Sequence, residues 1–117
     1  MADLDSKDPI ARESTRLYCA AVNGAQVSLD PKELREWMPN YSYGAHAFGL
    51  ANFQDLYDKR EKVMKWIKEY SPYELVSKDD PPVGLYYGAA PEMGAEKPDP
   101  THSANYGLPL QEKCQSL

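Results

Sequence analysis

The sequence predicts an α/β fold in which parallel strands are joined by a helical crossover. Two short apolar segments, residues 17–22 and 83–87, have the composition of buried strands. A long stretch with helical periodicity separates them, and a further helical pattern follows the second strand. Because parallel strands need a long crossover connection, this order of elements is typical of a parallel sheet with flanking helices.

The first two elements are a short helix and a strand. Residues 8–14 predict the helix, with Asp8 as its cap and Pro9 at the first helical position, where no amide hydrogen bond is lost. The nearly continuous apolar run at 17–22 is closed by an Asn-Gly pair that ends at Gly24. Such a run predicts a strand that is buried on both faces.

A second short helix and an aromatic loop follow. Residues 30–37 predict a helix with Asp30 as the cap and Glu33 at the capping-box position. Residues 38–50 read as a loop rich in Asn, Ser, Tyr and Gly. Its rings either pin the loop to the body or form the rim of a site. They are Tyr41, Tyr43, His46 and Phe48.

The strongest helical periodicity lies at residues 52–70, with Asn52 as the cap. The apolar side chains that share one face of this helix are predicted to pack in the core. They are Phe53, Leu56, Tyr57, Val63, Met64, Ile67 and Tyr70. Ser71, Pro72 and Glu74 then have the pattern that begins another short helix.

The C-terminal part predicts a strand, a loop and a helix. Residues 83–87 form the strand, and residues 89–101 form a loop rich in Pro and Gly. The last helix is predicted to begin near residue 101 or 102. Gly107 and Pro109 interrupt its first turns, so we expect a kink or a late start there.

Composition excludes several classes of partner. The formal net charge is −5, and such acidity disfavours nucleic acid and anionic membranes as partners. No apolar stretch is long enough for a membrane span. The two cysteines give no metal-binding or disulfide pattern, and no cofactor motif is present. Cys19 is predicted to be a small buried hydrophobic residue, and Cys114 is predicted to lie in a helix.

The whole chain, residues 1–117, is predicted to be a single partial domain. Two parallel strands leave both sheet edges open and form a sheet that is too narrow for the flanking helices to pack on fully. The pattern therefore predicts that further strands complete the sheet, and that the isolated chain associates with itself.

The one candidate catalytic residue is Asp99, which follows the second strand and precedes a helix. Sites of open α/β sheets lie beyond the carboxyl ends of the strands, and α/β hydrolases place their catalytic acid after a late strand. The alternative is that Asp99 only caps the helix. A metal site built from Asp99, His102 and Glu96 is a further alternative, for which the spacing is weak.

Most of the chain resembles the C-terminal part of bacterial α/β-hydrolase esterases and lipases, the feruloyl-esterase-like and acetyl-xylan-esterase-like group close to the hormone-sensitive-lipase type. The marks are SPYELV followed by DDPPV, then LYYG, then DPTHSANYG; upstream, DPIARESTR precedes AAVNGAQVSLDP. The resemblance implies a partial α/β-hydrolase fold, a small-molecule ester as substrate, and Asp99 as the acid of a Ser-His-acid triad.

The other triad members are not recognisable in this chain. No Gly-x-Ser-x-Gly nucleophile elbow is present in the sequence. In the family the His follows a further strand, and a spacing of three residues makes His102 an awkward partner for Asp99; His46 has no identifiable partner. The serines without an elbow setting are Ser14, Ser28, Ser42 and Ser103.

The sequence therefore predicts a C-terminal-side fragment of a carboxylic-ester hydrolase that is inactive alone. The alternative is a non-catalytic protein-binding module that uses the aromatic loop 38–50 and an open sheet edge.

Overall fold

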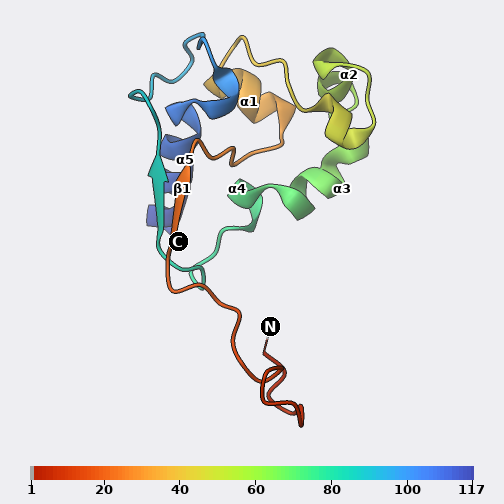
Figure 1. Ribbon diagram of the computed structural model, residues 1–117. Coiled ribbons are helices and arrows are strands. Elements are labelled where there is room, and N and C mark those ends of the chain that lie inside the picture. The colour runs from red at the N-terminus through yellow and green to blue at the C-terminus, as the bar shows by residue number, and fades with distance from the viewer. Residues whose placement is uncertain (1) are drawn as a thin grey trace.

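The computed structural model describes residues 2–117 and contains a two-stranded parallel sheet (Figure 1). The strands are β1 (Ala20–Asn23) and β2 (Val83–Tyr86). Their register runs from Ala20 opposite Val83 to Asn23 opposite Tyr86. The predicted parallel pairing and the helical crossover are thus confirmed, and the fold is of mixed α/β type.

The crossover contains most of the helices. It comprises α1 (Pro31–Trp37), the 3₁₀ turn η1 (Ala45–Phe48), α2 (Phe53–Asp58), α3 (Arg60–Tyr70) and α4 (Pro72–Leu75). After β2 come the 3₁₀ turns η2 (Pro100–His102) and η3 (Ala104–Tyr106), and then α5 (Gly107–Ser116). The late start of the last helix, at Gly107, is as predicted.

Two of the predicted helix caps are confirmed. Asp30 Oδ1 accepts a hydrogen bond from the amide of Lys32 at 2.9 Å at the start of α1. Asn52 Oδ1 accepts one from the amide of Asp55 at 2.9 Å at the start of α2. Each side chain satisfies an amide that has no partner within its own helix.

Two other capping side chains act differently from the prediction. Glu33 does not reach back to the backbone; it accepts a hydrogen bond of 2.5 Å from Ser28 Oγ, which itself accepts one from the amide of Asp30. Ser71 Oγ accepts the amide of Leu29 at 3.0 Å. Ser71 therefore joins α4 to the segment that precedes α1.

The long helix predicted at 52–70 is divided in two. Lys59 has φ −97° and ψ 12°, so it leaves the helical conformation between α2 and α3. No Gly or Pro stands near the break, so neither of the strongest helix-breaking residues accounts for it. The core stripe is correspondingly shorter, because Tyr57 and Tyr70 are exposed.

The buried members of the hydrophobic core lie among the helices and loops, and from the sheet only the partly buried Leu85 of β2 packs against them. The buried members come from the segment before α1, from the helices and from the loop at 38–45: Val27, Leu34, Trp37, Met38, Tyr41, Ala45, Phe53, Leu56, Val63, Ile67, Tyr106 and Leu110. Rings of the loop pack edge-to-face in this core, such as Tyr41 on Phe53 at a centroid distance of 5.5 Å. The aromatic loop is thus pinned to the body.

Burial of the sheet was predicted incorrectly. Residues 17–19 lie outside β1 and are exposed, with Tyr18 at 96% relative exposure, and β1 itself is only partly covered. Cys19 is likewise exposed. A parallel pair needs cover on both faces and both edges, and residues 2–117 do not supply it.

The N-terminal segment is an arm that leads away from the body (Figure 1). Residues 8–14 form turns instead of the predicted helix: Asp8 Oδ1 accepts the amide of Ile10 at 2.9 Å, which is an Asx turn and not a helix cap. Arg16 ties the arm to Asp79 through an exposed ion pair.

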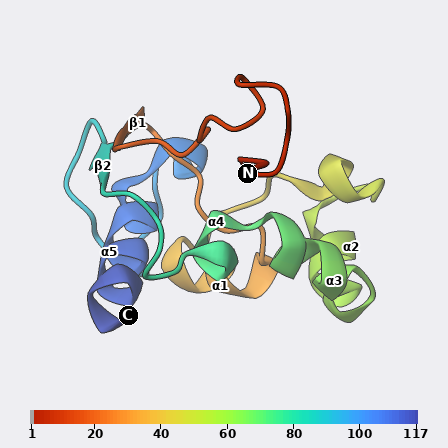
Figure 2. The ribbon, with the colours of Figure 1, turned by 90° about the horizontal axis from the view of Figure 1, so that it is seen from below.

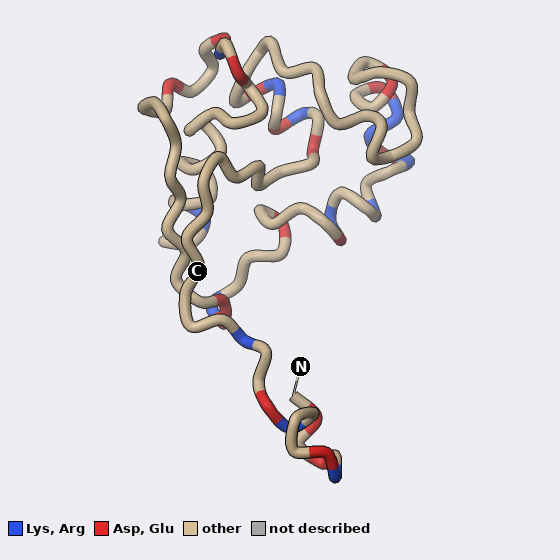
Figure 3. The backbone as a smooth tube through the Cα atoms, in the orientation of Figure 1, with Lys and Arg blue, Asp and Glu red and all other residues tan. Residues whose placement is uncertain are grey.

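Seen from below, the strand pair and α5 lie at one end of the molecule, and α2 and α3 lie at the other (Figure 2). Charged residues are spread over the arm, the helices and the loops, whereas both strands are free of them (Figure 3). Among the described residues, no helix has the length and apolar character to cross a membrane.

Candidate functional site

The candidate site is the turn that contains Asp99 and His102, at the carboxyl ends of the strands. Gly24 follows β1 directly, and its amide donates a hydrogen bond of 2.8 Å to the carbonyl of Tyr86 at the end of β2. A Cβ atom placed on Gly24 would lie 3.2 Å from Cδ2 of His102. The imidazole therefore sits against the end of β1, where sites of α/β sheets are found.

Asp99 and His102 form a hydrogen-bonded pair. Oδ2 of Asp99 lies 2.8 Å from Nδ1 of His102. The hydroxyl of Thr101 donates to Oδ1 of Asp99 at 2.6 Å and lies 3.1 Å from the same Nδ1. All three side chains therefore converge within one turn of the chain.

This pairing corrects the expectation that a spacing of three residues is unsuitable. Residues 100–102 form the 3₁₀ turn η2, and Asp99 precedes it. In a 3₁₀ helix, which has three residues per turn, the side chains at i and i+3 lie above one another. The helix predicted from residue 101 or 102 begins instead as this 3₁₀ turn.

The electrostatics of the pair favour an ionised carboxylate. Hydrogen bonds from Thr101 and then from His102 lower the pKa of Asp99 below its ordinary value. Both side chains are open to solvent, with relative exposures of 62% for Asp99 and 59% for His102. The backbone amide of Thr101 makes a smaller contribution to the lowered pKa of Asp99, but in the described chain no side-chain hydrogen bond of capping geometry joins Asp99 to η2.

The other candidate residues lie elsewhere. His46 is exposed and packs edge-to-face on Tyr43 at a centroid distance of 5.0 Å. Ser28 and Ser103 are buried in structural hydrogen bonds. Across residues 2–117, no serine hydroxyl bonds to a ring nitrogen of His102, and no group of three or more His, Cys, Asp or Glu is arranged to hold a metal ion.

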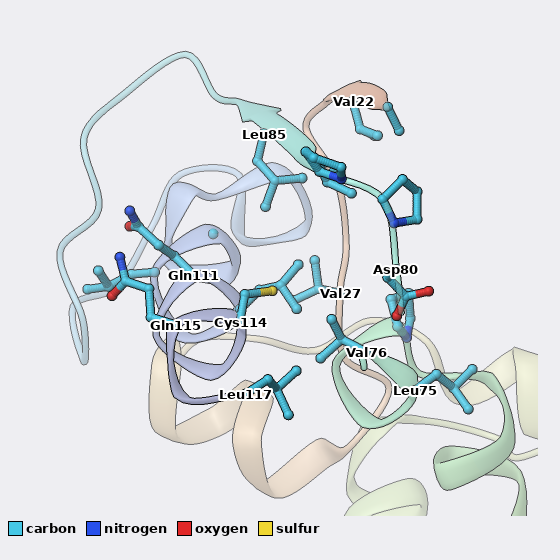
Figure 4. A pocket seen from close by; sticks show the side chains of 18 of the residues that line it. Val22, Val27, Leu75, Val76, Asp80, Leu85, Gln111, Cys114, Gln115 and Leu117 are labelled. Carbon is cyan, nitrogen blue, oxygen red and sulfur yellow. The ribbon is translucent and has the colours of Figure 1, made fainter. Parts of the chain in front are cut away.

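A wide apolar groove lies between the sheet and helices α4 and α5 (Figure 4). Its volume is about 1210 Å³. Val22 of β1 and Leu85 of β2 form one wall, while Leu75 of α4 and Cys114 of α5 contribute to the others. The groove is a sheet face that the described chain does not fill.

Sequence reasoning missed Asn105, which holds the loop that carries Asp99. This asparagine is fully buried. Its Nδ2 donates to the carbonyls of Trp37 and Glu92, each at 2.7 Å, and its Oδ1 accepts the amide of Glu92 at 2.7 Å. Asn105 follows Ser103 at the start of a turn, so the sequence offers only a capping pattern and no sign of this long-range role.

Comparisons with protein-family models, with curated proteins and with solved structures found no match to this chain.

Proposed function

We propose that this chain is the acid-bearing, C-terminal-side part of a carboxylic-ester hydrolase with the α/β-hydrolase fold. The observation that carries the proposal is the position of Asp99, which lies after β2 and holds an imidazole against the carboxyl end of β1. The resemblance of the DPTHSANYG segment to esterases and lipases supports the same assignment. The substrate class is a small-molecule carboxylic ester.

In this role Asp99 is a positioning residue. A triad acid holds the imidazole in the correct tautomer and stabilises the imidazolium that forms during acyl transfer. The nucleophile and the oxyanion hole must come from polypeptide outside residues 1–117, because the sequence contains no Gly-x-Ser-x-Gly elbow. The proposed hydrolase is therefore active only as a larger assembly.

The purified chain is accordingly expected not to hydrolyse short p-nitrophenyl esters above the rate of buffer. The measurement is p-nitrophenolate release, with Asp99→Ala as the matched variant. Labelling by a serine-directed fluorophosphonate is expected to be absent. Turnover that persists in Asp99→Ala, or that the fluorophosphonate abolishes, would contradict the assignment of Asp99 and the absence of a nucleophile.

The positive test combines the chain with the polypeptides encoded directly upstream and directly downstream of it, because the resemblance places the nucleophile before these residues and the family's His after them. Co-expression is expected to give ester hydrolysis that is sensitive to a fluorophosphonate. Changing Asp99 to Asn in that assembly should reduce kcat by roughly 10⁴-fold, because an amide favours the wrong imidazole tautomer. An upstream polypeptide without a nucleophile elbow, or an assembly without turnover, would contradict the proposal.

The second candidate function is a non-catalytic protein-binding module, and the groove is the observation that favours it. Met38 and Tyr41 are buried, so of the aromatic loop mainly Tyr43 and His46 remain available to a partner. The groove and the open edges of the sheet offer far more apolar surface. A partner would therefore bind at the sheet and not at the loop 38–50.

For the isolated chain we expect self-association through this groove. Sedimentation velocity should show a mean mass that rises with protein concentration, because apolar surface and open strand edges promote pairing between copies. Val22→Lys in the groove should suppress the effect, while Tyr57→Lys, on α2 and outside the groove, should not. A concentration-independent monomer with a sharp, cooperative melt would rule this out.

A further inference from the structure

We propose that His102 is the base that Asp99 orients, so that acid and base are supplied by a single turn of the chain. This inference rests on the ester-hydrolase function proposed above and goes beyond it. The sequence resemblance places the base after a further strand, whereas the geometry of residues 99–102 brings a suitable imidazole to the acid within this chain.

The hydrogen bonds around Nδ1 determine the tautomer of His102. The hydroxyl of Thr101 uses its single hydrogen on Oδ1 of Asp99 at 2.6 Å. At its 3.1 Å contact with Nδ1, Thr101 can therefore only accept a hydrogen bond. The carboxylate, 2.8 Å away, is an acceptor too. Two acceptors facing one nitrogen require that Nδ1 carry the hydrogen, which leaves the lone pair on Nε2.

The position of the ring makes this lone pair usable. Cδ2, the carbon bonded to Nε2, faces Gly24 at the carboxyl end of β1. Gly24 has φ +61° and lacks a Cβ atom, and both features let the ring lie against the strand end. The His102 side chain is 59% exposed, and in the proposed role Nε2 receives the proton of a nucleophile carried by a polypeptide that docks at this end of the sheet.

The proton transfer that follows is conventional for a base of this kind. As the nucleophile's oxygen bonds to the ester carbonyl carbon, its hydroxyl proton passes to Nε2. As the ester C–O bond breaks, that proton passes from Nε2 to the leaving alkoxide. Asp99 stays ionised throughout and holds the imidazolium in place. No further reactant is needed for this step.

The first test is ¹⁵N NMR of the full chain at a pH where its imidazoles are neutral. The two histidines of the sequence provide an internal comparison, because His46 contacts a ring and not a carboxylate. We expect the Nδ1–H tautomer for His102 and a different tautomer balance for His46. In Asp99→Ala, the signals of His102 should shift toward those of His46. An Nε2–H tautomer for His102 in the unchanged chain would overturn the inference.

The second test uses the assembly with the upstream and downstream polypeptides, so that a His after a further strand is also present. His102→Gln should lower kcat by about 10²–10⁴-fold, the range contributed by a general base, while His46→Gln should leave it unchanged. Activity that survives His102→Gln but not Asp99→Asn would overturn the inference and leave the proposed hydrolase intact. An Nδ1–H tautomer together with an inactive assembly would instead contradict the hydrolase itself, and with it the catalytic role of His102.

Discussion

Replacing Asn105 with alanine is expected to lower the free energy of unfolding by about 2–4 kcal/mol. The side chain makes three hydrogen bonds of 2.7 Å to main-chain groups of Trp37 and Glu92. Its loss leaves a cavity in the core and removes partners from the amide and carbonyl of Glu92. The carbonyl of Trp37 keeps a second donor, the amide of Gly94 at 3.1 Å, which limits the loss. Urea denaturation measures the change.

Asn40 provides a matched control for this prediction. It is exposed, and it bridges the same loop through Lys97: its Nδ2 donates to the carbonyl at 2.8 Å and its Oδ1 accepts the amide at 3.1 Å. Because water can replace both partners, Asn40→Ala should cost less than about 1 kcal/mol. Equal losses for the two variants would show that burial does not make Asn105 special.

Arg60→Met is expected to lower the free energy of unfolding by about 3 kcal/mol, near the lower end for breaking a buried ion pair. Arg60 donates from Nε to Asp30 Oδ1 at 2.7 Å and from a terminal nitrogen to Oδ2 at 2.5 Å. The Asp30 side chain is only 7% exposed, so the substitution leaves a buried carboxylate without its counter-charge. The same carboxylate caps α1, which couples the loss to that helix.

Arg16→Met is the control, since Arg16 and Asp79 are 56% and 84% exposed. An ion pair of that kind contributes about 0–1 kcal/mol. If Arg16→Met cost as much as Arg60→Met in chemical denaturation, burial could not be the source of the difference.

The cost of Arg60→Met should also depend on pH. Burial raises the pKa of Asp30. The hydrogen bonds from Arg60 and from the amide of Lys32, together with the charge of Arg60, lower this pKa by more than burial raises it, so the net shift is downward. A carboxyl group whose pKa is lower in the folded state adds stability above its unfolded pKa of about 4, and this stability is lost as pH falls through the folded pKa. The difference between wild type and Arg60→Met should therefore shrink below about pH 4.

Much of the fold could be predicted because it depends on local signals. The caps at Asp30 and Asn52 and the apolar runs that became β1 and β2 are short-range patterns, and the long crossover between the strands implied their parallel pairing. The break at Lys59 could not be predicted, since no residue near it disfavours a helix. The exposure of Tyr18 also lacked a signal, because an apolar run does not reveal what covers it.

The candidate site was predictable in one respect only. The order of elements placed Asp99 after a strand, where an acid is expected. The pairing with His102 arises in the turn formed by residues 100–102, and a spacing of three residues alone does not specify that the two side chains meet. Asn105 was missed because its partners, Trp37 and Glu92, are brought to it only by the tertiary fold.

The parallel register has a consequence for how the molecule forms. Ala20 pairs with Val83, so the sheet forms only when the two ends of a long loop meet. Closing this loop reduces the entropy of the chain before any hydrogen bond between the strands can offset the loss. The turn of Asp99 and His102 is local and carries no such cost. We therefore expect the acid–base turn to form early in folding and to reach its place beside Gly24 only in the last, slowest step.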